Sequence, residues 1–388
     1  MTFSWPENFY SDGIHGQLRR NPTKPDLGWL VSTKPAQVAG VFTRNTFPAA
    51  PVQIDQQVLR SNQPVHAIFV NSANANAFTG ATGLANAYET QKLVANKLHK
   101  TPAEVLVVST GIIGEQLPME KIRRGIERLQ ASTPLNLAKA MLTTDTTTKT
   151  AQVTQADYQI SGVAKGSGMI HPNMGTMLGF IATDVTIKQG LLQQLLRELV
   201  DVTFNQITID GDTSTNDTVL VLANGDDWQA EIKAGTAKYE AFKADLHQVL
   251  KTLAIAIASD GEGATRLIDV RVIGARHSAS AQRVAKSIVG SNLVKTAVFG
   301  ADPNWGRIID AIGNVGEVFE ADQLSIAINQ VPIIVAGHAV ANEVAATQAM
   351  QQDTIVITVD LGLGTEQGQA WGSDLTYEYV HINAAYHT

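Results

Sequence analysis

Apolar runs of strand length alternate with helical stretches along this chain of 388 residues. Residues 65–70 and 104–108 are largely apolar, and each run gives way to a polar or glycine-containing loop, at Asn71 and at Ser109. Residues 84–100, which separate the two runs, have the periodicity of a helix. Because strands and helices are interspersed without repeats or a linker, the sequence predicts an α/β fold with layered sheets and covering helices.

The remaining elements continue this alternation. Helical periodicity recurs at residues 190–204, 238–259 and 280–289, and strand-like runs occupy residues 324–336 and 354–361. Residues 1–60 are interpreted as short strands and turns.

The composition argues against several kinds of partner, metal site and nucleophile. A net charge of −7 without a basic block argues against a nucleic-acid partner. The sequence contains no apolar run of the ~20 residues that span a bilayer, and its first residues lack the order of a signal peptide, so we expect a cytoplasmic protein without a membrane partner. The absence of cysteine excludes disulfides, thiolate metal sites and cysteine nucleophiles. The nine histidines lack the HExxH spacing, and we expect no metal site.

The segment KGSGMIHPNMGTMLGF (165–180) is the strongest functional signal. Gly175 has no Cβ, which leaves its backbone unusually free and its carbonyl open to attack, and Thr176 opens the strand-like run 176–187. A chain cut between these two residues would present a hydroxyl nucleophile together with a free α-amino group (pKa about 7.7–8.0) as its base. The segment also fits a glycine-rich turn before an ordinary strand, with Lys165 as a solvated surface charge.

Two further segments gather hydroxyl groups. STGIIG (109–114) fits a turn that caps a helix. It also fits an oxyanion hole, in which the Thr110 hydroxyl and the Gly111 N–H donate hydrogen bonds to a developing negative charge. LTTDTTTK (142–149) surrounds Asp145 with threonines, a pattern that is also typical of strands and turns.

Two acidic segments come later in the chain. DGDTSTND (210–217) fails the pattern of a calcium loop, because Thr215 stands where glycine is needed and Val221 where glutamate is needed. We therefore interpret it as a hydrogen-bonded loop that supports a site. DGEGATR (260–266) places Glu262 between glycines, which also fits a turn with a solvated carboxylate.

Taken together, these segments resemble the ornithine acetyltransferase family, also called glutamate N-acetyltransferase. KGSGMIHPNMGTMLGF is similar to the family's self-cleavage segment, and STGIIG, TTDT, DGDTSTND and GEGATR are similar to its other motifs. The ending YVHINAAYHT (379–388) is similar to the family's YVxINAxYxT, so the resemblance runs almost end to end. Departures are Phe78 and Ser373 in place of cysteine, Arg266 in place of lysine, Gly175 in place of alanine, and His171 in place of a small residue.

The resemblance implies a self-processing fold of the N-terminal-nucleophile type, cut between Gly175 and Thr176 into chains 1–175 and 176–388, with two copies of each in the assembly. It implies Thr176 as the nucleophile and Thr110 and Gly111 as the oxyanion donors. The implied substrate-binding residues are Thr143, Lys165, Thr176, Glu262, Asn383 and Thr388, where Thr143 is chosen from a run of adjacent threonines.

The implied activity is transfer of the acetyl group from N-acetylornithine to glutamate in arginine biosynthesis, through an acetyl ester on Thr176 and without a cofactor. Whether acetyl-CoA is a second donor stays open. One alternative is a related self-cleaving aminopeptidase or amidase with water as the acceptor. Another is a non-catalytic binding protein that retains the fold.

Overall fold

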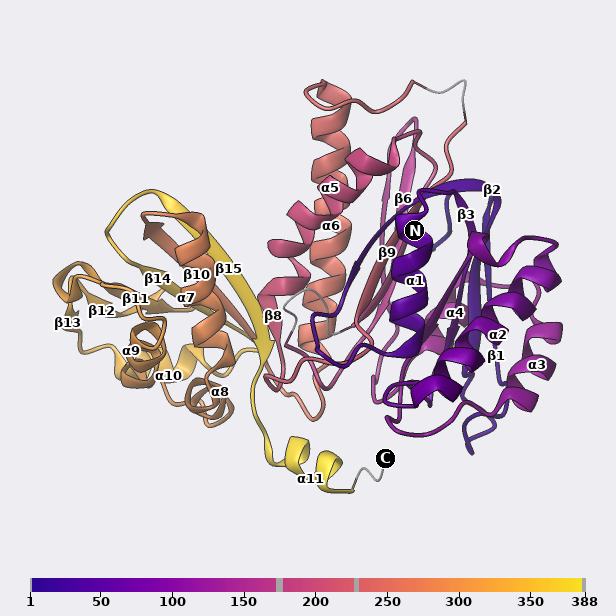
Figure 1. Cartoon of the computed structure of the whole chain (residues 1–388). Coiled ribbons are helices and arrows are strands. Elements are labelled where there is room, and N and C mark those ends of the chain that lie inside the picture. The colour runs from indigo at the N-terminus through magenta and orange to yellow at the C-terminus, as the bar shows by residue number, and fades with distance from the viewer. Residues whose placement is uncertain (1, 172–176, 227–229, 386–388) are drawn as a thin grey trace.

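The computed structural model describes residues 2–171, 177–226 and 230–385 (Figure 1). Gly175, Thr176 and Thr388, to which the resemblance assigns roles, lie outside these ranges. Within them the strands form two sheets, one of eight strands and one of seven.

The eight-stranded sheet runs in the order β4-β3-β2-β9-β7-β6-β5, with β1 paired to β2. Its strands are β1 (Phe9–Ile14), β2 (Leu27–Phe42), β3 (Val65–Asn71), β4 (Val105–Ser109), β5 (Lys149–Thr154), β6 (Gln159–Lys165), β7 (Leu178–Thr183) and β9 (Thr218–Ala223). The register of β2 is irregular between Val31 and Ala36. Residues 27–32 of β2 pair with β1, residues 27–31 and Ala36 pair with β3, and residues 37–42 pair with β9.

The two halves of this sheet pack against one another. Side chains of β3 and β4, such as Ile68 and Leu106, share one buried core with side chains of β7 and β9, such as Phe180 and Leu220. This arrangement places a second apolar face on the outside of each half, and helices cover both outer faces. The result is a stack of helices, sheet, sheet and helices.

The covering helices are α1 (Ala50–Arg60), α2 (Gly80–Leu98) and α3 (Met119–Arg128) on the half that contains β3 and β4, and α5 (Gln189–Asp201) and α6 (Ala237–Ser259) on the other half. Figure 1 shows α5 and α6 on the side of the sandwich that faces the second sheet. The short helix α4 (Pro134–Met141) contributes Leu137 and Met141 to the core between the halves. No helix of the described residues combines the length and the apolar character needed to cross a membrane.

The seven-stranded sheet runs in the order β13-β12-β11-β14-β10-β15-β8. Its strands are β8 (Ile207–Thr208), β10 (Leu267–Ala275), β11 (Ser325–Ile328), β12 (Val331–Val335), β13 (His338–Ala339), β14 (Thr354–Asp360) and β15 (Glu366–Ser373), and its helices are α7 (Ser278–Gly290), α8 (Asn292–Phe299), α9 (Trp305–Gly313) and α10 (Glu343–Ala349). The last helix, α11 (Tyr377–Ala385), leaves this sheet and runs toward the lower edge of the sandwich (Figure 1).

The predicted class, an α/β fold with layered sheets and covering helices, is confirmed. The interpretation of residues 1–60 as short strands and turns was wrong in two places. β2 is 16 residues long, and α1 begins at Ala50 with Pro51 in its first turn, where a missing N–H costs no hydrogen bond. The run 324–336 is a hairpin rather than one strand, because Asn329 and Gln330 take positive φ values of 45° and 71° between β11 and β12.

Candidate active site

Four strand ends meet at one edge of the sandwich. Lys165, at the end of β6, pairs with Leu178 at the start of β7, and Leu178 pairs with Thr218 at the start of β9. The Asn216 side chain donates a hydrogen bond of 2.9 Å to the carbonyl of Ser109, at the end of β4. A cavity of about 410 Å³ opens here. It is lined by residues 75, 110, 111, 113, 143, 144, 165, 168, 169, 177, 178, 214–217, 262 and 383.

The segment after β4 forms a turn that only glycine fits. Gly111 has a φ of 130°, and a Cβ there would lie 2.3 Å from the carbonyl carbon of Ala73. The Thr110 N–H donates to the Asn71 carbonyl at 3.0 Å, and the Ala75 N–H donates to the Ile112 carbonyl at 2.9 Å. The loop after β3 therefore holds Thr110 and Gly111 at the cavity wall.

Lys165 is buried rather than solvated. Its Nζ donates to the Thr110 hydroxyl oxygen at 3.3 Å, which places an ammonium group beside the predicted oxyanion donor. Burial lowers the pKa of Lys165, and the nearby Asp145 carboxylate opposes that shift. A buried cation at the wall of a polar cavity is suited to a carboxylate ligand.

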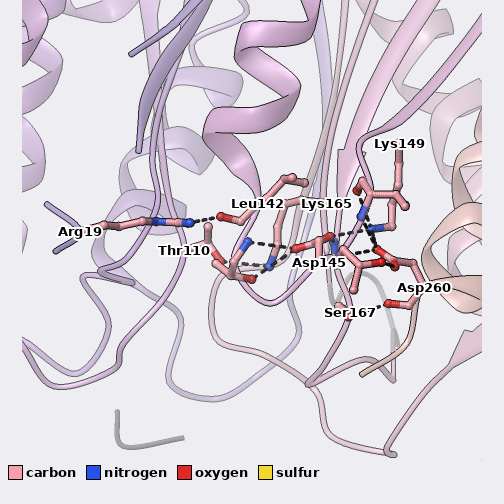
Figure 2. Close-up of polar contacts among 12 residues, drawn as sticks. Arg19, Thr110, Leu142, Asp145, Lys149, Lys165, Ser167 and Asp260 are labelled. Atoms are coloured by element: carbon pink, nitrogen blue, oxygen red, sulfur yellow. Dashed lines mark hydrogen bonds and ion pairs between the residues drawn. The ribbon is translucent and has the colours of Figure 1, made fainter. Parts of the chain in front are cut away.

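The segment 142–149 is fixed through Asp145 (Figure 2). The Asp145 carboxylate accepts hydrogen bonds from the N–H of Gly166 at 2.6 Å and of Thr143 at 3.0 Å, and it pairs with Lys149 at 2.7 Å. Burial raises the pKa of Asp145, but the ammonium groups of Lys165 and Lys149 outweigh this effect and lower it to about 2. Asp145 is therefore ionised at every pH at which the protein would be assayed.

The segments 210–217 and 260–266 complete the cavity. Asp210 accepts hydrogen bonds from the N–H of Met169 at 2.6 Å and of Ile170 at 2.8 Å, as expected of a loop that supports the site. Glu262 accepts a hydrogen bond of 2.8 Å from the Asn383 side chain. Within the described ranges, no group of three histidine, aspartate or glutamate side chains could hold a metal ion.

The structure brings together all the predicted site residues that it describes. Thr110, Gly111, Thr143, Lys165, Glu262 and Asn383 line the same cavity, although the first and last are separated by most of the chain. Thr144 lines it as well, so the geometry does not single out Thr143. Gly175, Thr176 and Thr388 lie outside the described residues, but Met177, the residue after Thr176, also lines the cavity.

The sequence did not identify two charged residues behind the segments that line the cavity. Lys149 and Asp260 received no role, although Lys149 donates to Asp260 at 2.6 Å beneath the segments that line the site. Their only sequence signal is a pair of opposite charges 111 positions apart, which no local pattern detects. His171, one of the departures, has its Nδ1 2.9 Å from the Thr208 hydroxyl, and burial lowers its pKa to about 4, so it is neutral at pH 7.

Comparisons with known proteins match nearly the whole chain to a single family. The sequence model of the ArgJ family matches residues 10–388. The arginine biosynthesis bifunctional protein ArgJ of Lactococcus lactis is 51% identical over 392 residues, which cover 99% of this chain and 98% of that protein. The protein of the same name from Lactiplantibacillus plantarum is 49% identical and covers 100% of this chain and 97% of its own length.

A solved relative agrees with these matches. The crystal structure of the arginine biosynthesis bifunctional protein argJ from Bacillus halodurans is 46% identical, with a TM-score of 0.53. The match covers 54% of this chain and 100% of that one. On this evidence the chain belongs to the ArgJ family.

Proposed function

We propose that this chain cuts itself between Gly175 and Thr176 and then transfers acetyl groups through an ester on Thr176. An acetyltransferase role in arginine biosynthesis follows from its membership of the ArgJ family. The observation that carries the finer proposal is the single cavity that contains Thr110, Gly111 and Lys165 together with Met177. Met177 directly follows Thr176 in the sequence.

In the cleavage step, the Thr176 hydroxyl oxygen attacks the carbonyl carbon of Gly175. The peptide C–N bond breaks as an ester forms, and the hydroxyl proton is transferred to the departing nitrogen of Thr176. Water then hydrolyses the ester, which leaves a carboxylate on Gly175 and a free amino group on Thr176. The Met177 carbonyl accepts a hydrogen bond of 2.9 Å from the Thr218 N–H at the start of β9, so the chain just after the cut is held by the sheet.

The length of the solved relative supports this cut. Its chain corresponds in full to 54% of this one. The proposed product of residues 176–388 contains 213 of the 388 residues, which is a similar share.

In the transfer step, the free amino group of Thr176 takes the proton of its own hydroxyl, and the oxygen attacks the acetyl carbon of N-acetylornithine. The Thr110 hydroxyl and the Gly111 N–H donate hydrogen bonds to the oxyanion. The C–N bond breaks, ornithine leaves with the proton on its amine, and the acetyl group stays on Thr176. The amine of glutamate then attacks this ester and regenerates the hydroxyl.

Charges around the cavity match amino-acid substrates. Lys165 offers an ammonium group to a substrate carboxylate, and Glu262, oriented by Asn383, offers a carboxylate to a substrate ammonium. Thr388 is assigned to the same substrate site through its place in the chain ending. Transfer needs no cofactor in this scheme. A location in the cytoplasm and an assembly of two copies of each product belong to the same proposal.

The decisive experiment is a denaturing gel of the purified protein. Two bands of about 19 and 23 kDa are expected, in proportion to residues 1–175 and 176–388 of a 41.5 kDa chain. Thr176→Ala lacks the attacking hydroxyl and should stay as one band. Complete processing of Thr176→Ala would contradict the proposal, whereas Thr176→Ser is a matched control that keeps a hydroxyl and should be cut.

The same preparation tests the transfer step. Mass spectrometry of the larger product after incubation with acetylornithine alone should show one added acetyl group, which glutamate should remove as N-acetylglutamate. Loss of the acetyl group to water at the same rate without glutamate would favour the aminopeptidase or amidase alternative. Acetyl-CoA in place of acetylornithine should give the same adduct if it is a second donor.

A further inference from the structure

Lys149 is a buried ammonium group between two carboxylates. Its Nζ lies 2.7 Å from Asp145 and 2.6 Å from Asp260, and only 1% of its side chain is exposed. Asp145 is fully buried, and the Asp260 side chain is 10% exposed. None of these three residues lines the cavity, and the transfer scheme assigns them no role.

Both carboxylates hold backbone N–H groups of segment 142–149, and Asp145 also holds the segment that begins at Lys165. Asp145 holds the N–H groups of Thr143 and Gly166, which belong to two of the segments that line the site. Asp260 accepts the N–H of Thr146 at 3.1 Å with its carboxylate.

Backbone groups of segment 260–262 form hydrogen bonds with Ser167 in segment 165–168. The Asp260 carbonyl accepts a hydrogen bond of 2.6 Å from the Ser167 hydroxyl. The Glu262 N–H in turn donates to the Ser167 carbonyl at 2.8 Å. Lys149 therefore lies where the segments 143–147, 165–168 and 260–262 are joined, as Figure 2 shows.

Besides burial, which has the largest effect on the pKa of Lys165, the same cluster contributes to the electrostatic environment of this residue. Asp145 faces both ammonium groups, Lys149 and Lys165, and the charges of Arg19 and Asp217 also act on Lys165. Two lysines and the two carboxylates Asp145 and Asp260 form a cluster without net formal charge. Arg19 donates to the Leu142 carbonyl on the other side of the cluster, and thereby fixes the start of segment 142–149.

We propose that Lys149 is a positioning residue for the acetyl transfer: through Asp145 and Asp260 it aligns the segments that carry Thr143, Lys165 and Glu262. Together with Asp145, which accepts the N–H of Gly166 next to Lys165, it also contributes to the electrostatic environment of the Lys165 ammonium group. This inference rests on the proposed function, because Lys165 and Glu262 are assigned to the substrate there. Lys149 itself touches no substrate.

The first test compares Lys149→Met with Lys149→Arg in self-cleaved protein. Methionine has a similar length but leaves two buried carboxylates without their shared cation, so KM for glutamate should rise roughly tenfold or more with a smaller change in kcat. Arginine retains the charge and should recover most of the loss. Lys243→Met, which removes a surface ion pair with Glu198, is the control and should leave both constants unchanged.

The second test uses the pH profile of kcat/KM, which a purely structural role would not shift. If the Lys165 ammonium binds a substrate carboxylate, its deprotonation sets the alkaline limb. Asp145→Asn removes an anion beside Lys165, so its pKa should fall and the limb should move to lower pH. Lys149→Met removes a cation, so the limb should move to higher pH. Unshifted limbs in both variants would overturn the assigned electrostatic role.

The third test does not depend on activity. Hydrogen–deuterium exchange of the Thr176→Ala protein with and without Lys149→Met should show faster exchange in segments 142–149, 165–171 and 260–264, and not in α5 or α9. Unchanged exchange there would overturn the positioning role. If the wild-type protein transfers no acetyl group at all, the proposed function fails, and the exchange experiment still decides whether Lys149 joins the three segments.

Discussion

At the scale of single residues, the site depends on groups that have little conformational freedom. Gly111 cannot carry a Cβ, and the Thr110 hydroxyl is held between its own backbone anchor and the Lys165 ammonium. Groups that are fixed before the reaction lose no energy to reorganisation when charge develops. Such a hydroxyl should act mainly on the transition state.

Replacing Thr110 tests this expectation. Thr110→Ala should lower kcat by roughly 10²–10³-fold with little change in KM, because a donor used in the transition state is lost. Thr110→Ser keeps the hydroxyl and should retain most of the activity. Steady-state rates are to be measured only on fully processed protein. A Thr110→Ala enzyme with normal kcat would reduce Thr110 to a turn residue.

Some residues of the site could be identified from the sequence, and others could not. Thr110, Gly111, Lys165 and Glu262 stand in short segments with several unusual residues, so resemblance to a family identifies them. The contact of Lys149 with Asp260 joins positions 111 residues apart, and the fold alone creates it. The burial of Lys165 could not be predicted either, because it results from the packing of segments that are distant in sequence.

At the scale of elements, α1 illustrates a helix that sequence periodicity did not reveal. Its buried face includes Val52, Ile54 and Val58 but also Asp55, whose carboxylate accepts a hydrogen bond of 2.9 Å from the Val107 N–H of β4. A carboxylate in the expected apolar stripe hides the helical pattern. Elements with long, continuous patterns, such as α6 and β14, were predicted within a residue at each end.

The buried Asp55 makes a prediction about stability. Burial raises the pKa of Asp55 well above its usual value, although the Val107 N–H opposes this. The folded state therefore favours the protonated form, so the stabilising contribution is complete below the unfolded pKa of about 3.9 and is lost as pH rises through the folded pKa. Asp55→Asn removes the charge and keeps an acceptor for Val107.

Thermal unfolding should show the difference. At pH 8 the Asp55→Asn protein should have a higher Tm than the wild type, and near pH 4 the two values should converge. Each unit by which the pKa is raised corresponds to ~1.4 kcal/mol. A lower Tm for Asp55→Asn at pH 8 would mean that the carboxylate is ionised and stabilising.

At the scale of the whole molecule, the proposed cut divides the chain so that neighbouring strands of one sheet belong to different products. β7 and β9, which follow Thr176, lie between β2 and β6, which precede Gly175. β9 pairs with β2 over six residues, and β7 pairs with β6 over six more. The products of residues 1–175 and 176–388 would therefore share one set of backbone hydrogen bonds and one buried core.

The two products should consequently stay together after cleavage. Size-exclusion chromatography without denaturant should give a single peak that contains both bands in equal molar amounts, also at high salt. Besides ion pairs such as Lys149 with Asp260, the products share a continuous sheet and an apolar core, which salt does not screen. Separation of the bands into two peaks under native conditions would show that the sheet does not survive the cut.

The strand order also bears on whether the proposed cut precedes or follows folding. A polypeptide of residues 1–175 alone would have β2 and β6 without the strands that separate them, and such open edges invite aggregation. If the chain is cut as proposed, we therefore expect β7 and β9 to pair with β2 and β6 in the intact precursor before the bond is broken. On this proposal, chains 1–175 and 176–388 that are synthesised separately would not be equivalent to the single precursor, because neither would contain all the strands of the eight-stranded sheet.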